Sequence, residues 1–383
     1  MSNNNLKAAR KAKNDEFYTQ LTDIEKELRH YRDKFEDKVI YANCDNPQFS
    51  NFVRYFIMNF SFLKIKKFIA TYYNKDGHGG KLVVTNDNID SFIVNGDYKQ
   101  SVINDNIQEL AGDGDFRSDE CVELLKESDI VVTNPPFSLF REFVGLMMNE
   151  DKKFSCIGNT NAITYKEIFP LIKQNQLWLG YIANKTLEFH VPDSYEKFNY
   201  IDELGGKVAK VPSIAWFTNI DTTKRHKHID LYCNYYGNEN SYPKYDNYDA
   251  INVDKVSEIP VDYAGVMGVP ISFMMKYDPE QFEIVAFRKG NGGKDLVFTR
   301  EGEREFNRTF VSLYDVDSRD DKKCRRKNQW KTYLCKNNNQ TEIEPIDYFY
   351  PNATNLANTL VNDCTINGKK TYIRVLIRKK GTN

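Results

Sequence analysis

The 383-residue sequence lacks the marks of membrane, secreted and metal-stabilised proteins. Its longest apolar runs, such as residues 178–183, are far shorter than the roughly 20 residues that span a bilayer. Its seven cysteines stand singly, without Cys-x-x-Cys pairs, which disfavours a disulfide framework and a structural zinc site. Residues 1–14 are polar and basic, with no apolar stretch behind them as a signal peptide would have. We therefore expect a cytoplasmic protein without a metal.

The apolar residues are distributed as in an α/β fold. The 40% of hydrophobic residues suffice for a core, and the length favours two domains. Short apolar runs typical of strands alternate with amphipathic helices, and near-continuous apolar strands predict a mostly parallel, doubly wound sheet covered on both faces. The expected strands are residues 38–42, 68–73, 129–133, 154–158, 177–182 and 213–218, and a hairpin-like stretch at residues 81–95 breaks the alternation. The expected first residues or N-caps of the helices are Thr22, Ser50, Ser138 and Thr164.

The composition changes beyond about residue 235. Tyr, Asn and Asp become dense in residues 234–248, and the later segments are short and interrupted by Gly and Pro. We therefore expect a flexible arm at residues 1–14, an α/β domain at residues 15–235 and a smaller α+β domain at residues 236–383.

The sharpest chemical signal is Asn134-Pro135-Pro136-Phe137, which lies between an expected strand and an expected helix. In the simpler interpretation, the two prolines merely end a strand. In the functional interpretation, the loop helps to alkylate an amine whose lone pair is delocalised into an aromatic ring. The Asn134 side-chain oxygen and the Pro135 carbonyl would accept from both N–H bonds, and the prolines would stiffen the loop. Phe137 would stack on a planar base, a contact worth roughly 1–3 kcal/mol.

Two other polar loops are candidate walls of a methyl-donor site, which we expect at the carboxyl ends of neighbouring strands. Asp45 could accept from the ammonium group or ribose of a donor, although a turn or capping role suits Asn43 and Asp45 equally well. Asp115 could accept from an adenine amine while Phe116 packs against the ring. Residues 112–115 taken alone are more typical of a simple turn.

Together these motifs resemble a known family. Residues 16–19, 43–47, 114–116 and 134–137 are similar to motifs of the S-adenosylmethionine-dependent amino-methyltransferases. Residues 15–28, 39–52, 134–143, 211–218 and 268–283 resemble the EcoRI-type adenine-specific DNA methyltransferases. The resemblance implies a Rossmann-like methyltransferase domain with S-adenosylmethionine as cofactor. It implies a donor pocket lined by Phe17, Tyr18, Thr19, Asn43, Asp45, Asp115 and Phe116, and a catalytic loop formed by Asn134, Pro135, Pro136 and Phe137.

The sequence departs from that pattern at two places. The loop after the first strand lacks the Gly-x-Gly that is usual in this superfamily, so residues 43–45 must approach the donor without glycine. The strand at residues 68–73 is followed by Asn74-Lys75-Asp76 rather than by an immediate acidic residue. The partner of the donor ribose is therefore unassigned.

The balance of 53 Lys+Arg against 54 Asp+Glu gives a net charge of −1, which alone argues against a nucleic-acid partner. The charges are segregated, however. Acids dominate residues 105–129, and the basic clusters are residues 224–228, 288–294, 319–331 and 369–380. One charge run is usually a solvated surface, but four clusters together favour contacts with DNA phosphates. The candidate DNA-binding residues are Arg288, Lys289, Lys294, Arg325 and Arg326.

The sequence thus predicts a monomeric enzyme that transfers a methyl group to the N6 amine of an adenine flipped out of double-stranded DNA, with residues 236–383 as a target-recognition domain. Methylation of RNA or of protein glutamine is an alternative, because similar loops serve those reactions. A methyltransferase-like protein that only binds DNA is a second alternative. His226 and His228 are expected to be surface residues rather than metal ligands, since the sequence spacing offers them no partner ligand.

Overall fold

The computed structural model describes residues 17–287 and 364–381, except residues 76, 194, 204, 247, 368 and 372. The chain divides into two compact units, Met1–Thr222 and Thr223–Asn383. This division comes slightly earlier than the change of composition at about residue 235. Within the described ranges, the helices are all too short or too polar to cross a membrane.

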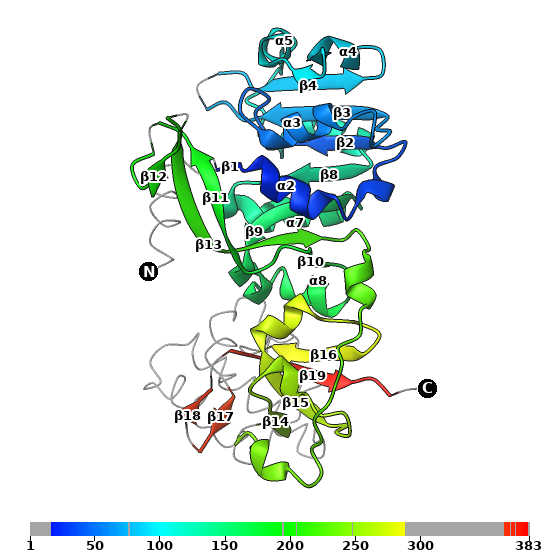
Figure 1. Ribbon diagram of the computed structural model, residues 1–383, viewed down its shortest axis with the longest axis vertical. Coiled ribbons are helices and arrows are strands. Elements are labelled where there is room, and N and C mark those ends of the chain that lie inside the picture. Colours follow the sequence, from blue (N-terminus) through cyan, green and yellow to red (C-terminus); the bar gives the residue numbers. More distant parts are fainter. Residues whose placement is uncertain are drawn as a thin grey trace, which may run out of the picture. The chain divides into compact units, whose positions relative to one another are not determined.

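The first unit is built on one large mixed sheet, in which eleven strands of the described chain take part (Figure 1). The strand order is β1-β11-β13-β9-β8-β2-β3-β4-β7, with β10 and β12 also pairing with β13. The strands are β1 (Tyr18–Thr19), β2 (Val39–Ala42), β3 (Lys67–Tyr72), β4 (Gly80–Thr85), β7 (Gln108–Glu109), β8 (Ile130–Thr133), β9 (Lys153–Asn159), β10 (Trp178–Leu179), β11 (Lys185–Val191), β12 (Tyr200–Ile201) and β13 (Lys207–Thr218). A separate small hairpin joins β5 (Ile93–Val94) to β6 (Asp97–Tyr98).

Only the centre of this sheet is parallel. β3, β2, β8 and β9 pair in parallel, whereas β4 and β13 run antiparallel to β3 and β9 respectively. The expected mostly parallel sheet is therefore corrected to a mixed one. The reason is that β4 returns directly beside β3, and β11 and β13 form a long antiparallel ladder, neither of which requires a crossover helix. All residues of β2 and β8 are buried, as their continuous apolar runs predict for central strands.

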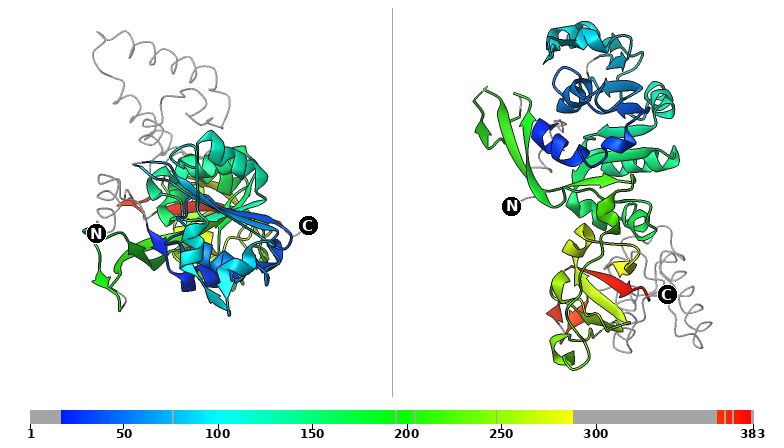
Figure 2. Two further views of the ribbon diagram at one scale, coloured as in Figure 1. Left: turned by 90° about the horizontal axis from the view of Figure 1, so that it is seen from above. Right: turned by 45° about the vertical axis from the view of Figure 1, so that its right-hand side comes forward.

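Helices cover both faces of this sheet (Figure 2). The longer helices of the unit are α2 (Leu21–Leu28), α3 (Asn51–Met58), α6 (Asp119–Glu127) and α7 (Phe140–Asn149), and the shorter ones are α4 (Ile89–Phe92), α5 (Gln100–Asp105) and α8 (Phe169–Lys173). Single turns of 3₁₀-helix are η1 (Arg32–Lys34), η2 (Phe137–Leu139) and η3 (Thr160–Thr164). The buried side of α3 carries Phe52, Phe56 and Ile57, which join a continuous hydrophobic core. Burial of such an apolar side contributes most of the stability of a short helix.

Local capping signals were only partly correct. Ser50 caps α3 as predicted, since its side chain accepts from the main-chain nitrogen of Phe52 at 3.0 Å. Gln20, rather than Thr22, is the N-cap of α2. Ser138 lies inside η2, and α7 begins only at Phe140, because the preceding proline leads into a 3₁₀ turn. Thr164 likewise ends η3 instead of opening α8.

The described part of the second unit contains a four-stranded sheet in the order β14-β15-β19-β16. Its strands are β14 (Ala250–Asn252), β15 (Val266–Pro270), β16 (Phe282–Phe287) and β19 (Arg374–Lys379), and a small hairpin joins β17 (Thr365–Ile366) to β18 (Lys369–Lys370). The 3₁₀ turns are η4 (Thr223–His226), η5 (Glu239–Ser241), η6 (Val256–Glu258) and η7 (Ile271–Met275). The last strand of the chain, β19, lies between β15 and β16, so the end of the sequence completes this sheet.

Candidate active site

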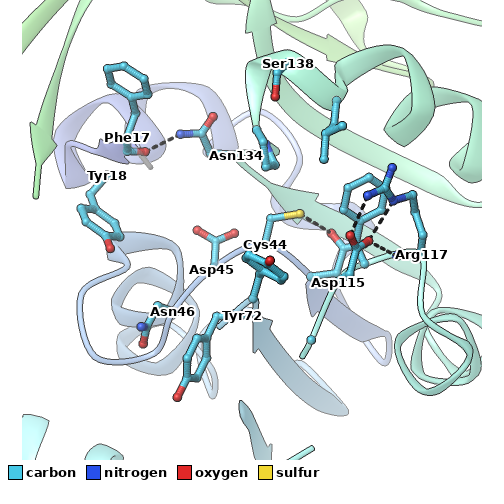
Figure 3. Close-up of a pocket in the computed structure, with 16 residues that line it drawn as sticks. Phe17, Tyr18, Cys44, Asp45, Asn46, Tyr72, Asp115, Arg117, Asn134 and Ser138 are labelled. Carbon is cyan, nitrogen blue, oxygen red and sulfur yellow. Dashed lines mark hydrogen bonds and ion pairs between the residues drawn. The ribbon is translucent and has the colours of Figure 1, made fainter. Parts of the chain in front are cut away.

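A pocket of about 390 Å³ lies at the carboxyl ends of β2, β3 and β8 (Figure 3). Parallel strands bring the loops that follow them to one edge of the sheet, which is where ligands bind in open α/β sheets. The lining residues are Phe17, Tyr18, Asn43, Cys44, Asp45, Asn46, Tyr72, Tyr73, Gly114, Asp115, Phe116, Arg117, Asn134, Pro136, Ser138 and Leu139.

The residues before α2 form one wall of this pocket. β1 pairs with β11, with Tyr18 opposite His190, and the side-chain amide of Asn51 donates to the Thr19 carbonyl at 2.8 Å. The Phe17 ring lies 5.7 Å from the ring of Phe137, centroid to centroid. The start of the described chain is thereby packed directly against the Asn-Pro-Pro-Phe loop.

Asn134 is held by its nitrogen and leaves its oxygen free. Its Nδ2 donates to the Phe17 carbonyl at 2.5 Å (Figure 3). Its Oδ1 is buried and has no hydrogen-bond partner among the described residues. A buried acceptor without a donor costs roughly 1–3 kcal/mol, so this oxygen is a favourable place for an N–H group of a ligand.

Asp45 joins three elements rather than pointing an unused carboxylate into the pocket. Its Oδ1 accepts from Ser50 Oγ at 2.7 Å and its Oδ2 from Thr133 Oγ1 at 2.5 Å. Burial raises the pKa of Asp45 to about 6, against the opposing effect of hydrogen bonds from Thr133, Ser50 and the main-chain nitrogen of Asn134. The carboxylate thus connects the loop after β2 with the N-terminus of α3 and with the strand that carries Asn134.

The two side chains before Asp45 in this loop are Asn43, which is buried, and Cys44, which is half-buried. Asn43 is 1% exposed, and its Nδ2 has no hydrogen-bond partner in the described part of the chain. Burial, together with the nearby carboxylates of Asp45 and Asp115, raises the pKa of the Cys44 thiol well above its ordinary range. Cys44 is therefore protonated at neutral pH, and its weak nucleophilicity argues against a covalent role.

The loop before α6 forms the opposite wall. Asp115 accepts from Arg117 Nε at 2.9 Å and from Arg117 Nη2 at 2.6 Å, and these bonds lower the pKa of the carboxyl. Gly114 has φ of +79°, and a Cβ at this position would lie 2.1 Å from the carbonyl oxygen of Tyr72. Only glycine lets this loop approach the end of β3 so closely. Phe116 is buried against Phe143, with ring centroids 5.6 Å apart.

The structure brings most of the expected donor-site residues to this pocket. Thr19 is the exception, since it does not line the cavity, and its buried Oγ1 has no hydrogen-bond partner among the described residues. In the expected catalytic loop, Pro135 and Phe137 do not line the cavity either. Three lining residues were not among the expected site residues: Tyr72, Tyr73 and Arg117. Cys44 and Asn46 belong to the loop at residues 43–47, which was expected as a wall, but neither was given a role of its own. The expected DNA-binding residues Arg288, Lys289, Lys294, Arg325 and Arg326 lie outside the described residues.

Tyr72 and Tyr73 occupy the carboxyl end of β3, where the sequence offered no acidic residue for a ribose. The only sequence signal for these two residues as part of a site was their position at the end of an apolar strand. This signal is weak, because tyrosine is common at strand ends. The two rings nevertheless give this wall both apolar surface and hydroxyl groups.

Comparison with known proteins identifies the family of this chain. The family described as "Adenine-specific methyltransferase EcoRI" matches residues 5–380. The chain is 50% identical over 319 residues to the type II methyltransferase M.EcoRI of Escherichia coli, covering 77% of this chain and 92% of the relative. It is 41% identical over 282 residues to M.MpnI of Mycoplasma pneumoniae, covering 72% and 83%, and 38% identical over 284 residues to M.MgeORF184P of Mycoplasma genitalium, covering 72% and 84%.

No solved structure matches the chain significantly. The family match spans both units, and the aligned relatives are themselves covered over most of their length. The chain therefore belongs to the EcoRI family of adenine-specific methyltransferases, and it is a DNA adenine methyltransferase.

Proposed function

We propose that this enzyme takes its methyl group from S-adenosylmethionine, held in the pocket at the ends of β2, β3 and β8, and transfers it to the N6 amine of a flipped-out adenine. The observation that carries the proposal is a pair of buried polar atoms, Asn134 Oδ1 and Asn43 Nδ2, that belong to residues lining this pocket and have no hydrogen-bond partner among the residues that the structure describes. One is an acceptor and the other a donor, as a ligand with both kinds of polar group requires.

The pocket residues fit such a donor. A volume of about 390 Å³ lies within the roughly 300–1,000 Å³ range of small-molecule sites. Asn43 would donate to a carboxylate or hydroxyl group, and Tyr18 and Tyr72 supply aromatic surface for a purine. We assign donor binding to Phe17, Tyr18, Asn43, Asp115 and Phe116, and we leave Thr19 out of this set because it does not line the cavity. We assign Asp45 a positioning role, because it is buried and its two oxygens accept from Ser50 and Thr133 on two other elements. Asp115 also accepts from Arg117, but its side chain remains 26% exposed at the cavity wall.

Asn134 is the central group of the proposed mechanism. The donor, when bound, supplies an electrophilic methyl group. Asn134 Oδ1 and the Pro135 carbonyl accept from the two N–H bonds of the adenine amine, which raises the electron density on nitrogen and orients it toward the methyl carbon. The bond from Nδ2 to the Phe17 carbonyl fixes which amide atom faces the amine. The surplus proton leaves to water after transfer, so no general base is needed.

Phe137 is proposed to stack on the extruded base. Its ring contacts Phe17 and Phe189, with centroids 5.7 and 6.3 Å away, so it is held firmly while one side of the loop remains close to the pocket. Stacking of this kind offsets part of the few kcal/mol required to take a base out of the duplex.

We propose that the first unit carries methyl transfer and the second unit carries DNA recognition. The parallel centre of the first sheet, with helices on both faces and a pocket at the strand ends, supports a Rossmann-like methyltransferase domain. We propose that the second unit recognises the DNA target, with Arg288, Lys289, Lys294, Arg325 and Arg326 among its phosphate or groove contacts. We further propose that the enzyme acts as a monomer.

The substitution Asn134→Ala tests this assignment. Removing the acceptor should lower kcat by a factor of about 100 or more, whereas donor affinity and the unfolding temperature should change little. Methyl transfer from labelled donor would be measured on DNA, with RNA and a protein extract as alternative substrates, and donor binding by calorimetry. Unchanged turnover would refute the role of Asn134, and loss of donor binding without loss of fold would move Asn134 to the donor site. Label in RNA or protein but not in DNA would refute the proposed substrate.

A further inference from the structure

Two histidines and two carboxylates meet in the second unit, although they are about 50 residues apart in sequence. His226 Nδ1 lies 2.8 Å from Glu280 Oε1, and His228 Nδ1 contacts Asp278 Oδ2. One ligand atom each from His228, Asp278 and Glu280 lies within 4.8 Å of the others. The end of η4 and the residues that follow it thus face the loop between η7 and β16, and the two segments together present a set of side chains that can bind a metal.

The buried member of this group is Asp278. Its side chain is 0% exposed. Its Oδ1 accepts from the main-chain nitrogen of Glu280 at 2.8 Å, but its Oδ2 is buried without a hydrogen-bond partner among the described residues. His228 Nδ1 lies against this oxygen without the geometry of a hydrogen bond. A buried carboxylate oxygen left in this state is costly unless a cation or a donor compensates it.

The two segments are held together independently of these four side chains. Gln281 accepts from the Ile229 main-chain nitrogen and donates to the Ile229 carbonyl, both at 2.8 Å. The histidine segment is therefore fixed against the carboxylate loop before any cation arrives, and the ordering cost of binding is reduced.

We propose that His228, Asp278 and Glu280 form a divalent transition-metal site, with His226 as an additional imidazole beside it. Two imidazoles with two carboxylates are a donor set that suits Zn²⁺, Ni²⁺ or Co²⁺ better than the oxygen-preferring Mg²⁺ and Ca²⁺. The metal would cross-link the first segment of the second unit to the loop before β16. This is a structural role, separate from the pocket that carries methyl transfer.

Metal titration of the full-length, tag-free enzyme after EDTA treatment and desalting tests the site. We expect one equivalent of Co²⁺ to bind with visible absorption bands of nitrogen and oxygen coordination, and Zn²⁺ to displace it in competition. His228→Ala and Asp278→Asn should each abolish this binding. The metal should also raise the unfolding temperature of the native enzyme but not of these two variants, because it binds the folded state.

Lys227→Ala is the matched control, since Lys227 lies between the two histidines and carries no metal-binding group at neutral pH. This variant should bind Co²⁺ as the native enzyme does. Absence of saturable binding at about 1 mM metal would overturn the proposal. Equal binding by the native enzyme and the His228→Ala variant would also overturn it, because the metal would then sit elsewhere. Circular dichroism of each variant separates loss of the site from loss of the fold.

Discussion

The side-chain nitrogen of Asn134 donates a 2.5 Å hydrogen bond to the main-chain carbonyl of Phe17, which precedes it by 117 residues. This single bond decides the orientation of the amide, because the nitrogen is committed to the protein, which leaves the oxygen for the adenine amine in the proposed mechanism. It also ties the segment before α2 to the catalytic loop. The position of this segment at the pocket and the orientation of the Asn134 amide are thereby linked.

Asn134→Asp tests the two functions of the side chain separately, the hydrogen bond from Nδ2 to Phe17 and the acceptor oxygen for the amine. An aspartate keeps an oxygen for the amine but cannot donate to the Phe17 carbonyl, and two oxygens would face each other. We expect kcat to fall by about 10-fold or more, but by less than in Asn134→Ala. The repulsion between the two facing oxygens, which Asn134→Ala does not introduce, should displace Phe17 and Tyr18 from the pocket wall and weaken the affinity for the donor. Single-turnover methylation together with calorimetry of donor binding would measure both effects. A loss equal to that of Asn134→Ala, with donor affinity unchanged, would contradict the anchoring role.

Asp45 predicts a pH dependence of activity. The ionised carboxylate accepts from Ser50, Thr133 and the main-chain nitrogen of Asn134. When the carboxyl is protonated, it must donate one hydrogen itself, and one of these donors loses its acceptor. Since the pKa is raised to about 6, we expect kcat to fall as the pH drops through about 6. In Asp45→Asn, kcat should be lower at all pH values and should no longer fall as the pH drops through about 6. Asp33→Asn, at an exposed position, is the control and should keep the pH profile of the native enzyme.

The Asp45 carboxyl should also make the free energy of unfolding depend on pH, and protonation should raise this free energy although it lowers kcat. Its pKa rises from the ordinary 3.8 to about 6 on folding, so the protonated form favours the native state. This stabilisation is fully present below about pH 4 and is lost as the pH rises through about 6, a difference of about 3 kcal/mol. Urea unfolding at a series of pH values should show this slope in the native enzyme and not in Asp45→Asn. An identical slope in both proteins would contradict the burial argument.

Gly114 and Gly112 form a matched pair within one loop. A Cβ at Gly114 would lie 2.1 Å from the Tyr72 carbonyl oxygen at a φ of +79°, whereas a Cβ at Gly112 meets nothing within 4 Å. Gly114→Ala should therefore destabilise the first unit by roughly 1–3 kcal/mol and weaken donor binding, because Asp115 and Phe116 are displaced. Gly112→Ala should change neither. Thermal unfolding and donor calorimetry would show the contrast, and equal behaviour of the two variants would be evidence against the close approach.

The parts of the fold that the sequence predicts are those with local signals. The buried runs of β2 and β8 and the cap at Ser50 are recognisable because strand burial and capping act over a few residues. A strand at residues 213–218 and a hairpin-like stretch at residues 81–95 were expected, but the antiparallel pairing of β13 with β9 and of β4 with β3 was not predicted, since pairing direction depends on contacts between distant segments. An apolar run has the same appearance in a parallel and in an antiparallel position.

In the site, too, contacts between distant segments could not be predicted from the sequence. Asn134 stands out in the sequence because of its two prolines, but its bond to the Phe17 carbonyl has no sequence signature. Asp45 was expected to face the donor, whereas its oxygens accept from Ser50 and Thr133. These bonds can be seen only in the folded chain, because they join the loop after β2 to the start of α3 and to β8. Asp278 and Glu280 were not considered as partners of the histidines for the same reason.

The proposed DNA contacts predict a strong dependence of binding on salt, despite the net charge of −1. Counterion release depends on local phosphate contacts and not on total charge, so each lost contact should reduce the slope of log K against log salt by about 0.9. The double substitution Arg325→Ala and Arg326→Ala should lower the slope by up to about 2. Lys64→Ala with Lys67→Ala is the control, because both lysines lie at the amino-terminal end of β3, away from the pocket, and already pair with Glu36 and Glu127. Fluorescence anisotropy with a labelled duplex over a range of salt concentrations gives the slopes. A slope that falls in the control but not in the arginine variant would place the DNA on a different surface.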